Sequence, residues 1–389
     1  MKHDKKTDSV TAKPLPDLRI WLNLLVFILI IGGLGLTNII APNPDVLVSE
    51  RRQPAQLPAL SLDTVLNSRF MNSFENYTAD NFIFREQLRT IRSVMVLQAL
   101  HMSDKDGLYI GAAGAGKITP INATGLLAWA SLMEQLQQDL ATQSANLSFY
   151  YAIIPDKSLY DERALPGYDP DLAADMLSGR LPGITAIDLT DAMIASDYYR
   201  TDLHWDQAQL GQRPGDVVDV ITTSLGCQNR QTADYTVHDA GEFTGVYPGQ
   251  LALNLPADRL RYLNSPFIDK MVAHYLDPRT GEFVEGPVYD LAAGAGRDGY
   301  DLFLRGAQPL VIVENTVAQS DRELYIFRDS YTSSLAPLLA TEYARVTLID
   351  LRYIDYRVLP QYVSFTSDSD VLFLYGSQIL NDPSVLLIR

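Results

Sequence analysis

The sequence predicts an α/β protein with a parallel sheet, carried behind a single membrane-spanning helix. Two observations predict the fold class. Between residues 310 and 375, continuous apolar runs of strand length alternate with helix-length segments. Earlier in the chain, an amphipathic helical pattern at 126–140 leads into an apolar run at 149–154. Continuous apolar strands joined by helices are typical of a parallel sheet that is covered on both faces.

Hydrophobic periodicity gives the individual elements. Helical spacing of apolar residues is found at 70–95, 126–140 and 206–225, the last interrupted by Pro214 and Gly215. Strand-length apolar runs are found at 149–154, 184–189, 310–313, 324–327, 346–351 and 371–375. Residues 226–300 are rich in Gly, Asp and Tyr, so we expect loops and short strands there, as a possible insertion.

Residues 20–41 carry no charged side chain and are long enough to cross a bilayer once, since about 20 apolar residues span its core. Lys and Arg exceed Asp in residues 1–19, and this bias keeps that tail in the cytoplasm. A cleaved signal peptide is the alternative, but we find no small-x-small exit site. We therefore predict a single-pass protein of the cell membrane whose C-terminal domain is extracytoplasmic.

The rest of the chain divides into a linker and one large domain. Four prolines punctuate residues 42–60, which we interpret as an extended linker. Residues 61–389 are then the extracytoplasmic domain, which is large enough to bury its own core. No later apolar run is long enough to span the membrane again.

Composition limits the partners of this domain. The chain has 31 Lys and Arg against 47 Asp and Glu, a net charge of −16, which argues against nucleic acid. A neutral glycan, or an anionic one held by a local basic patch, stays open. Cys227 is the only cysteine, so the exported domain has no intramolecular disulfide, as suits a bacterial surface protein.

A first candidate for chemistry is the turn at Asp329 and Ser330. It follows the apolar run 324–327 and precedes a helix that we expect to begin near Thr332. Active residues of open parallel sheets gather at the carboxyl ends of the strands, and backbone N–H groups of a helix N-terminus can stabilise an oxyanion. The alternative is structural, because Asp and Ser are also common helix caps.

A serine nucleophile needs a base, and histidines are few. Outside the tail they are His101, His204, His238 and His274. Asp202 and His204 are two residues apart, so in an extended segment they project to the same side. The alternative is a surface histidine beside a buried Trp205. Asp202 and His204 supply at most two metal ligands where catalytic zinc usually has three, so we expect no metal and no cofactor.

With both segments in view, the chain resembles the DHHW family, relatives of the SGNH-hydrolase-like domain of alginate O-acetyltransferases. The resemblance covers about residues 70–375. Its landmarks, in order, are FENYTAD at 74–80 with FRE at 84–86, PDK at 155–157 followed by Tyr160, Glu162, Leu165 and Pro166, TDLHW at 201–205, GYDLFLRG at 299–306, residues 312–315, RDSY at 328–331 and IDLRY at 349–353.

The resemblance implies an SGNH-like three-layer α/β/α domain with Ser330 as nucleophile, His204 as base and Asp202 orienting His204. Two positions depart from the family pattern. Leu203 replaces a histidine of the name motif, and we expect it to point away from the site and be harmless. Arg328 stands where many SGNH-like proteins have Gly. The candidates for substrate contact are the neighbouring landmark residues Lys157, Arg352, Asn315, Asp329 and Tyr331. For Lys157, Arg352 and Asn315 the favoured alternative is a structural role.

The leading hypothesis is transfer of an acyl group, most simply acetyl, to an exported polysaccharide through an ester on Ser330. By family resemblance the donor is a multi-spanning membrane O-acyltransferase, since acetyl-CoA is not expected outside the cell. A carbohydrate acetylesterase would use the same three residues with water. A non-catalytic glycan-binding or assembly protein on the same scaffold is the third possibility, given 21 tyrosines available for sugar stacking.

Overall fold

The computed structural model describes residues 18–227 and 235–388 and forms two compact units, Met1–Leu88 and Arg89–Arg389. Residues 61–88 therefore group with the N-terminal helix and not with the large domain, which the sequence predicts to begin at residue 61. Within the described residues one helix is long and apolar enough to cross a membrane, at Arg19–Ile40. A signal sequence would have the same length and composition.

The first unit consists of the apolar helix and the short helices that follow it. They are α1 (Leu18–Ile40), the 3-10 turn η1 (Val48–Glu50), α2 (Leu62–Leu66), α3 (Arg69–Asp80) and the start of α4 (Arg85–Val94). The linker expected at 42–60 is not extended throughout. Leu47 forms an isolated bridge with Arg52, and Arg52 makes an ion pair with Asp80 of α3, so the chain folds back there.

The second unit is built on a mixed sheet. Among the described residues it has eight strands in the order β5-β4-β13-β11-β12-β10-β8-β9. Their bounds are β4 (Ser148–Ile154), β5 (Ile184–Ile187), β8 (Met271–Leu276), β9 (Phe283–Gly286), β10 (Leu310–Asn315), β11 (Glu323–Arg328), β12 (Arg345–Ile349) and β13 (Asp370–Gly376). The strands from β5 to β12 in this order pair in parallel, which confirms the α/β class.

One strand runs against the sequence prediction. We expected 310–313 to join a parallel sheet, but β10 pairs antiparallel with both β12 and β8. Only residues 316–322 connect β10 to β11, and no crossover helix lies among them. A parallel connection needs a crossover of a dozen or more residues, so this short link reverses the chain direction.

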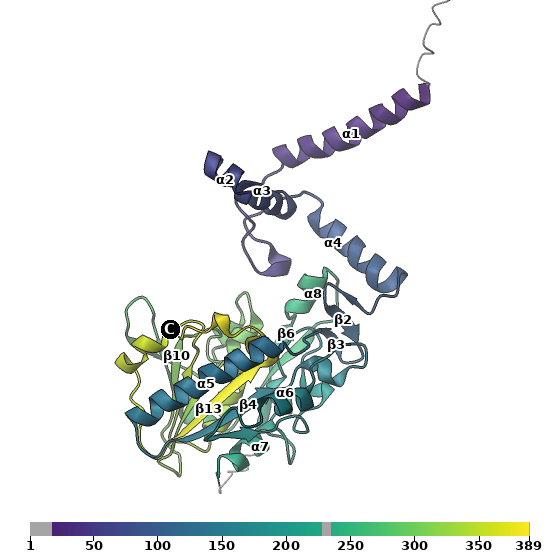
Figure 1. Ribbon diagram of the computed structural model, residues 1–389. Helices are drawn as coiled ribbons and strands as arrows, with labels where there is room; N and C mark the ends of the chain where they lie inside the picture. The colour runs from purple at the N-terminus through teal and green to yellow at the C-terminus, as the bar shows by residue number, and fades with distance from the viewer. Residues whose placement is uncertain (1–17, 228–234, 389) are drawn as a thin grey trace, which may run out of the picture. The chain divides into compact units, whose positions relative to one another are not determined.

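Helices cover both faces of the sheet, which gives the three layers that the resemblance implies. On one face lie α5 (Ala123–Gln143), seen across the sheet in Figure 1, and α6 (Pro170–Leu177); α11 (Ser377–Asn381) packs with α5. On the other lie α7 (Val217–Ser224) and α10 (Thr332–Leu339). Alternate residues of β11 point into the hydrophobic cores on opposite faces of the sheet. Leu324 and Ile326 pack with α7 and α10. Tyr325 and Phe327 pack with α5 and α6.

Smaller elements surround this sheet. They are β1 (Asp104–Lys105), β2 (Leu108–Gly111), β3 (Gly114–Lys117), β6 (Thr236–Phe243), α8 (Val246–Leu251), β7 (Asp258–Asn264) and α9 (Leu291–Gly294). The possible insertion at 226–300 is not separable from the fold, because β8 and β9 are strands of the central sheet. In the described part of this range, 235–300, β6 and β7 pair as a sheet of their own.

Candidate active site

Ser330 lies in the turn between β11 and α10, at the carboxyl edge of the parallel strands. Asp329 fixes this turn. One carboxylate oxygen of Asp329 accepts from the backbone N–H of Tyr331 at 3.1 Å, and the other accepts from the N–H of Gly376, at the end of β13, at 2.7 Å. Burial raises the pKa of Asp329. Asp329 thus holds the two strand ends together, and both its oxygens face the protein backbone.

His204 connects Asp202 to Ser330. The Nδ1 of His204 lies 2.6 Å from Oδ1 of Asp202, and its Nε2 lies 2.8 Å from the hydroxyl of Ser330. The segment is a tight bend and not the extended strand that we expected. Asp202 Oδ1 also accepts from the backbone N–H of His204 at 3.0 Å, which closes the bend. With the proton on Nδ1, Nε2 can accept the hydroxyl proton of Ser330.

Asp202 is held as a carboxylate. Its side chain is buried, which by itself would raise its pKa, but the neighbouring charge and hydrogen bonds of His204 outweigh burial and lower the pKa. Its second oxygen accepts from the backbone N–H of Val246 at 3.0 Å. An ionised, doubly held carboxylate can both fix the imidazole and stabilise its protonated form.

Two aromatic rings hold the imidazole in place. The ring of Tyr300 stacks on His204 with centroids 3.9 Å apart and planes 12° apart, and its hydroxyl lies 2.8 Å from Ser334 Oγ. Tyr331 meets His204 edge-on, and its hydroxyl donates to the Leu203 carbonyl at 2.8 Å. Sequence reasoning gave Tyr300 no role, because it is one of 21 tyrosines and lies far from His204 in the chain.

Lys157 stabilises the chain just before the bend by hydrogen bonds to backbone carbonyls. Its ammonium group donates to the carbonyls of Ala115 at 2.8 Å and Tyr199 at 2.6 Å, and the residue is 2% exposed. Burial lowers the pKa of Lys157 to about 8. The expectation that Lys157 contacts substrate is not supported, since the amine is enclosed and bonded to backbone just upstream of Asp202.

Asn315 lies at the wrong edge of the sheet. Because β10 runs antiparallel to β12, its last residue stands at the edge where the parallel strands begin, opposite to Ser330. The Asn315 amide donates to the Ala340 carbonyl at 2.9 Å and is buried. This position does not support a substrate contact for Asn315, and the reversed direction of β10 is the reason.

The remaining landmark residues lie near Ser330 in the chain or at the same edge. Arg352 follows β12, and its guanidinium makes two hydrogen bonds with the buried Asp350, at 2.9 and 2.7 Å. Arg328 is fully buried and donates to Ser333 Oγ at 2.8 Å, so it occupies the interior and not the approach to Ser330. Leu203 is half-buried and packs against apolar cores. Across residues 18–227 and 235–388, no group of three or more His, Cys, Asp or Glu side chains is placed to hold a metal ion.

The mostly parallel sheet with helices on both faces is an SGNH-like α/β/α fold. Solved structures with this fold include Bacillus cereus PatB1 with a sulfonyl adduct, at 18% sequence identity and a TM-score of 0.55, over 72% of this chain and 98% of that one. A DHHW family protein from Eubacterium siraeum matches at 17% identity and a TM-score of 0.56, over 72% and 94%. The resemblance to the DHHW family is thus confirmed as a shared fold.

The O-acetyltransferase domain of Pseudomonas putida AlgJ is also similar, at 11% identity and a TM-score of 0.40, over 71% of this chain and 92% of that domain. Comparison of the sequence with protein-family models and with curated proteins gives no match.

Proposed function

We propose that this chain is a membrane-anchored, extracytoplasmic acyltransferase that transfers an acetyl group to an exported polysaccharide through Ser330. The observation that carries the proposal is the continuous hydrogen-bonded series from Asp202 through His204 to Ser330. Three residues in this geometry are what nucleophilic acyl transfer by serine requires. The shared fold with DHHW and PatB1 structures is compatible with it.

In the first step the Ser330 hydroxyl oxygen attacks the carbonyl carbon of the acetyl donor while His204 Nε2 takes the hydroxyl proton. The tetrahedral intermediate collapses, His204 returns that proton to the leaving group, and an acetyl ester remains on Ser330. In the second step a sugar hydroxyl attacks the ester, His204 takes its proton, and the proton then passes back to Ser330. Asp202 stays ionised throughout and balances the imidazolium.

We propose that the backbone N–H of Ser330 and the positive end of the α10 dipole stabilise the negatively charged oxygen of the tetrahedral intermediate. The N–H of Tyr331 is not a second donor, because it is already bonded to Asp329. Arg352 lies at the same edge with 22% of its side chain exposed, and we propose it as the contact for donor or acceptor.

The membrane arrangement is part of the proposal. We propose that α1 stays uncleaved, with the N-terminus in the cytoplasm, and that the acetyl group arrives across the bilayer from a multi-spanning O-acyltransferase. Acetyl-CoA is not expected outside the cell. This membrane-anchored chain would therefore need such a donor nearby to acetylate Ser330. The proposal requires of the acceptor glycan only that it carries a free hydroxyl group.

The test is to incubate the purified full chain with an activated acetyl ester and record the intact mass. The proposal predicts an adduct of about 42 Da that is absent from Ser330→Ala. Because PatB1 carries a sulfonyl adduct in one structure, an aryl sulfonyl fluoride is a second probe with the same control. An adduct that survives in Ser330→Ala would exclude Ser330 as the nucleophile.

The same experiment separates the alternatives. Fast release of acetate without any glycan would favour an esterase, because water would then replace the sugar hydroxyl. No adduct with either probe would favour the non-catalytic glycan-binding protein. Transfer of label from the acetylated chain to added polysaccharide is the result that the acyltransferase requires.

A further inference from the structure

The first unit exposes a set of large apolar side chains that its own fold does not cover. They belong to α2, α3 and the turn before α4, with exposed fractions from 38% to 84%: Leu62, Leu66, Met71, Phe74, Ile83 and Phe84. On α3 the aromatic residues fall on one face, where Phe70 stacks on Phe74 and Phe74 contacts Tyr77. Exposed apolar surface of this extent marks an interaction site.

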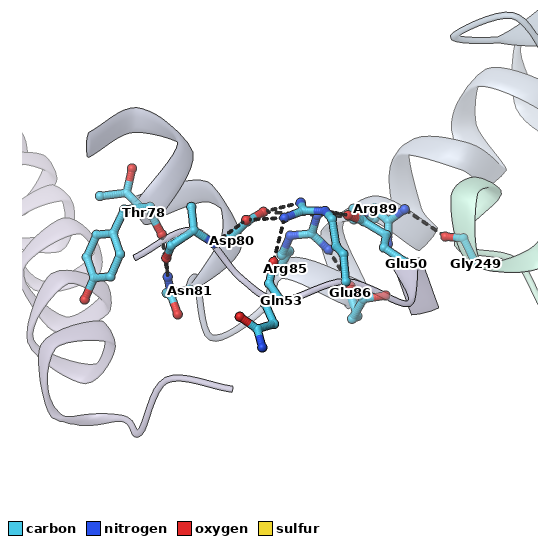
Figure 2. Close-up of polar contacts among 12 residues, drawn as sticks. Glu50, Gln53, Thr78, Asp80, Asn81, Arg85, Glu86, Arg89 and Gly249 are labelled. Atoms are coloured by element: carbon cyan, nitrogen blue, oxygen red, sulfur yellow. Dashed lines mark hydrogen bonds and ion pairs between the residues drawn. The ribbon is translucent and has the colours of Figure 1, made fainter. Parts of the chain in front are cut away.

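Polar residues hold this unit together from the inside. Asp80 is 7% exposed and accepts two hydrogen bonds from the guanidinium of Arg52, at 2.6 and 2.7 Å. Arg85 pairs with Glu50 at 2.5 Å, and Asn81 donates to the Ala55 carbonyl at 3.0 Å. Figure 2 shows Asp80, Arg85 and Glu50 in this network. The motif at 74–86 therefore fixes a turn while leaving its aromatic side chains outside.

Two hydrogen bonds tie the segment 77–83 to the last turn of α1 and to the residues just after it. The Asn38 side chain accepts from the backbone N–H of Ile83 at 3.0 Å, and the Asn43 amide donates to the Tyr77 hydroxyl at 3.2 Å. Asn38 lies about 3 Å short of the helix end at Ile40, because a helix rises about 1.5 Å per residue. Ile83 and Tyr77 thus lie at the depth where the apolar helix stops.

We infer that residues 70–84 dock on the membrane surface, with the aromatic face of α3 and the side chains of Ile83 and Phe84 in the headgroup region. The inference rests on α1 being an uncleaved anchor, as in the proposed function. Aromatic side chains are favoured where hydrocarbon meets water, and an amphipathic helix lies in that plane with its apolar face toward the lipid.

The charge of the segment specifies the kind of lipid contact. Residues 42–88 contain six Asp or Glu against four Arg, so anionic lipid offers no net attraction. Docking therefore depends on apolar burial and is the same in zwitterionic and anionic membranes. The consequence is that the chain leaves the membrane surface at Arg85, and not at Pro42 as an extended linker would require.

The test uses the full chain reconstituted alone in phosphatidylcholine nanodiscs, with Cys227→Ser to remove the native thiol. A single cysteine at Phe74→Cys carries an environment-sensitive fluorophore, and spin-labelled lipids measure its depth by quenching. Asn72→Cys is the matched control, because it lies on the opposite face of the same helix. Docking predicts quenching at 74 at least about threefold stronger than at 72, unchanged by added phosphatidylglycerol.

Equal quenching at the two positions, or none at 74, would overturn the proposal. Quenching at 74 that required a co-reconstituted membrane protein would overturn it in favour of a protein partner. Intact mass of the same sample reports whether α1 is retained, and its loss would remove the anchor and the docking together. Ser330→Ala must leave the quenching unchanged, so failure of the acetyl-transfer chemistry is measured separately.

Discussion

The two units distribute polar and apolar residues in opposite ways. In the second unit both faces of the sheet are apolar and buried, and the polar series Asp202, His204 and Ser330 stands at the strand edge. In the first unit the carboxylate of Asp80 is buried, its ion-pair partner Arg52 is half-exposed, and the aromatic side chains of α3 are outside. Water drives the first arrangement, because apolar burial stabilises by about 25 cal/mol per Å². The second arrangement suits a lipid surface.

The largest expected effect comes from removing the negative charge of Asp202 in the second unit. Asp202→Asn should lower the rate of Ser330 acetylation about 10³- to 10⁴-fold, because an amide favours the wrong imidazole tautomer. Time-resolved intact mass measures the rate. Lipid quenching at position 74 should not change. A loss below tenfold would show that Asp202 does not orient His204.

Lys157→Met tests the buried support of the bend. The folded-state pKa of about 8 lies below the ordinary 10.5, so the unfolded chain binds more protons between these values. Stability linked to Lys157 is therefore complete above about 10.5 and lost as pH falls through about 8, by about 3 kcal/mol. Denaturation curves of both proteins from pH 7 to 10.5 measure it. If the stability of the wild type and that of Lys157→Met changed with pH in the same way, the lowered pKa of Lys157 would be contradicted.

Asp80→Asn breaks the ion pair between the buried Asp80 and the half-exposed Arg52 in the first unit. It should destabilise the fold of residues 47–55 by about 2 kcal/mol, because charge-assisted hydrogen bonds from Arg52 are lost. The same bonds lower the pKa of Asp80, so their stabilisation is present at neutral pH and lost on acidification. Hydrogen exchange of 47–55 measures the change. The acetylation rate should stay at the wild-type value. A change in that rate would show that the first unit influences the chemistry of the second.

Tyr300→Leu removes the ring that stacks on His204. Acetylation should slow roughly tenfold, because the imidazole loses a contact that restricts its orientation. Tyr300→Phe is the control, since it keeps the ring and loses only the hydroxyl's hydrogen bonds to Ser334 and to the Tyr331 carbonyl. Equal rates in the two variants would assign the effect to the hydroxyl and not to stacking.

Leu203→His should have the smallest effect. The side chain packs against apolar cores, so restoring the histidine of the family motif should change the acetylation rate less than about twofold. A modest drop in melting temperature is expected from placing a polar ring in that half-buried position. A large gain in rate would mean that a second histidine takes part in the chemistry.

The sequence by itself determined the features that depend on neighbours in the chain. The absence of charge at 20–41 predicts the apolar helix, period and length predict the helices and strands, and the strand-to-helix turn predicts where Ser330 lies. Spacing predicted only that Asp202 and His204 project to the same side. Their pairing came with the family resemblance, and the segment is a bend and not a strand. The order of several weak motifs was enough to indicate the SGNH-like fold.

Only the tertiary structure decided the features that depend on distant contacts. The direction of β10 removes Asn315 from the site, the burial of Lys157 turns an expected substrate contact into a support, and Tyr300 reaches His204 from another loop. The ion pair of Arg52 with Asp80 likewise folds back a segment that its prolines alone made look extended. Local pattern records which face of an element is apolar, whereas strand direction and the partners of buried polar groups depend on how distant segments pack.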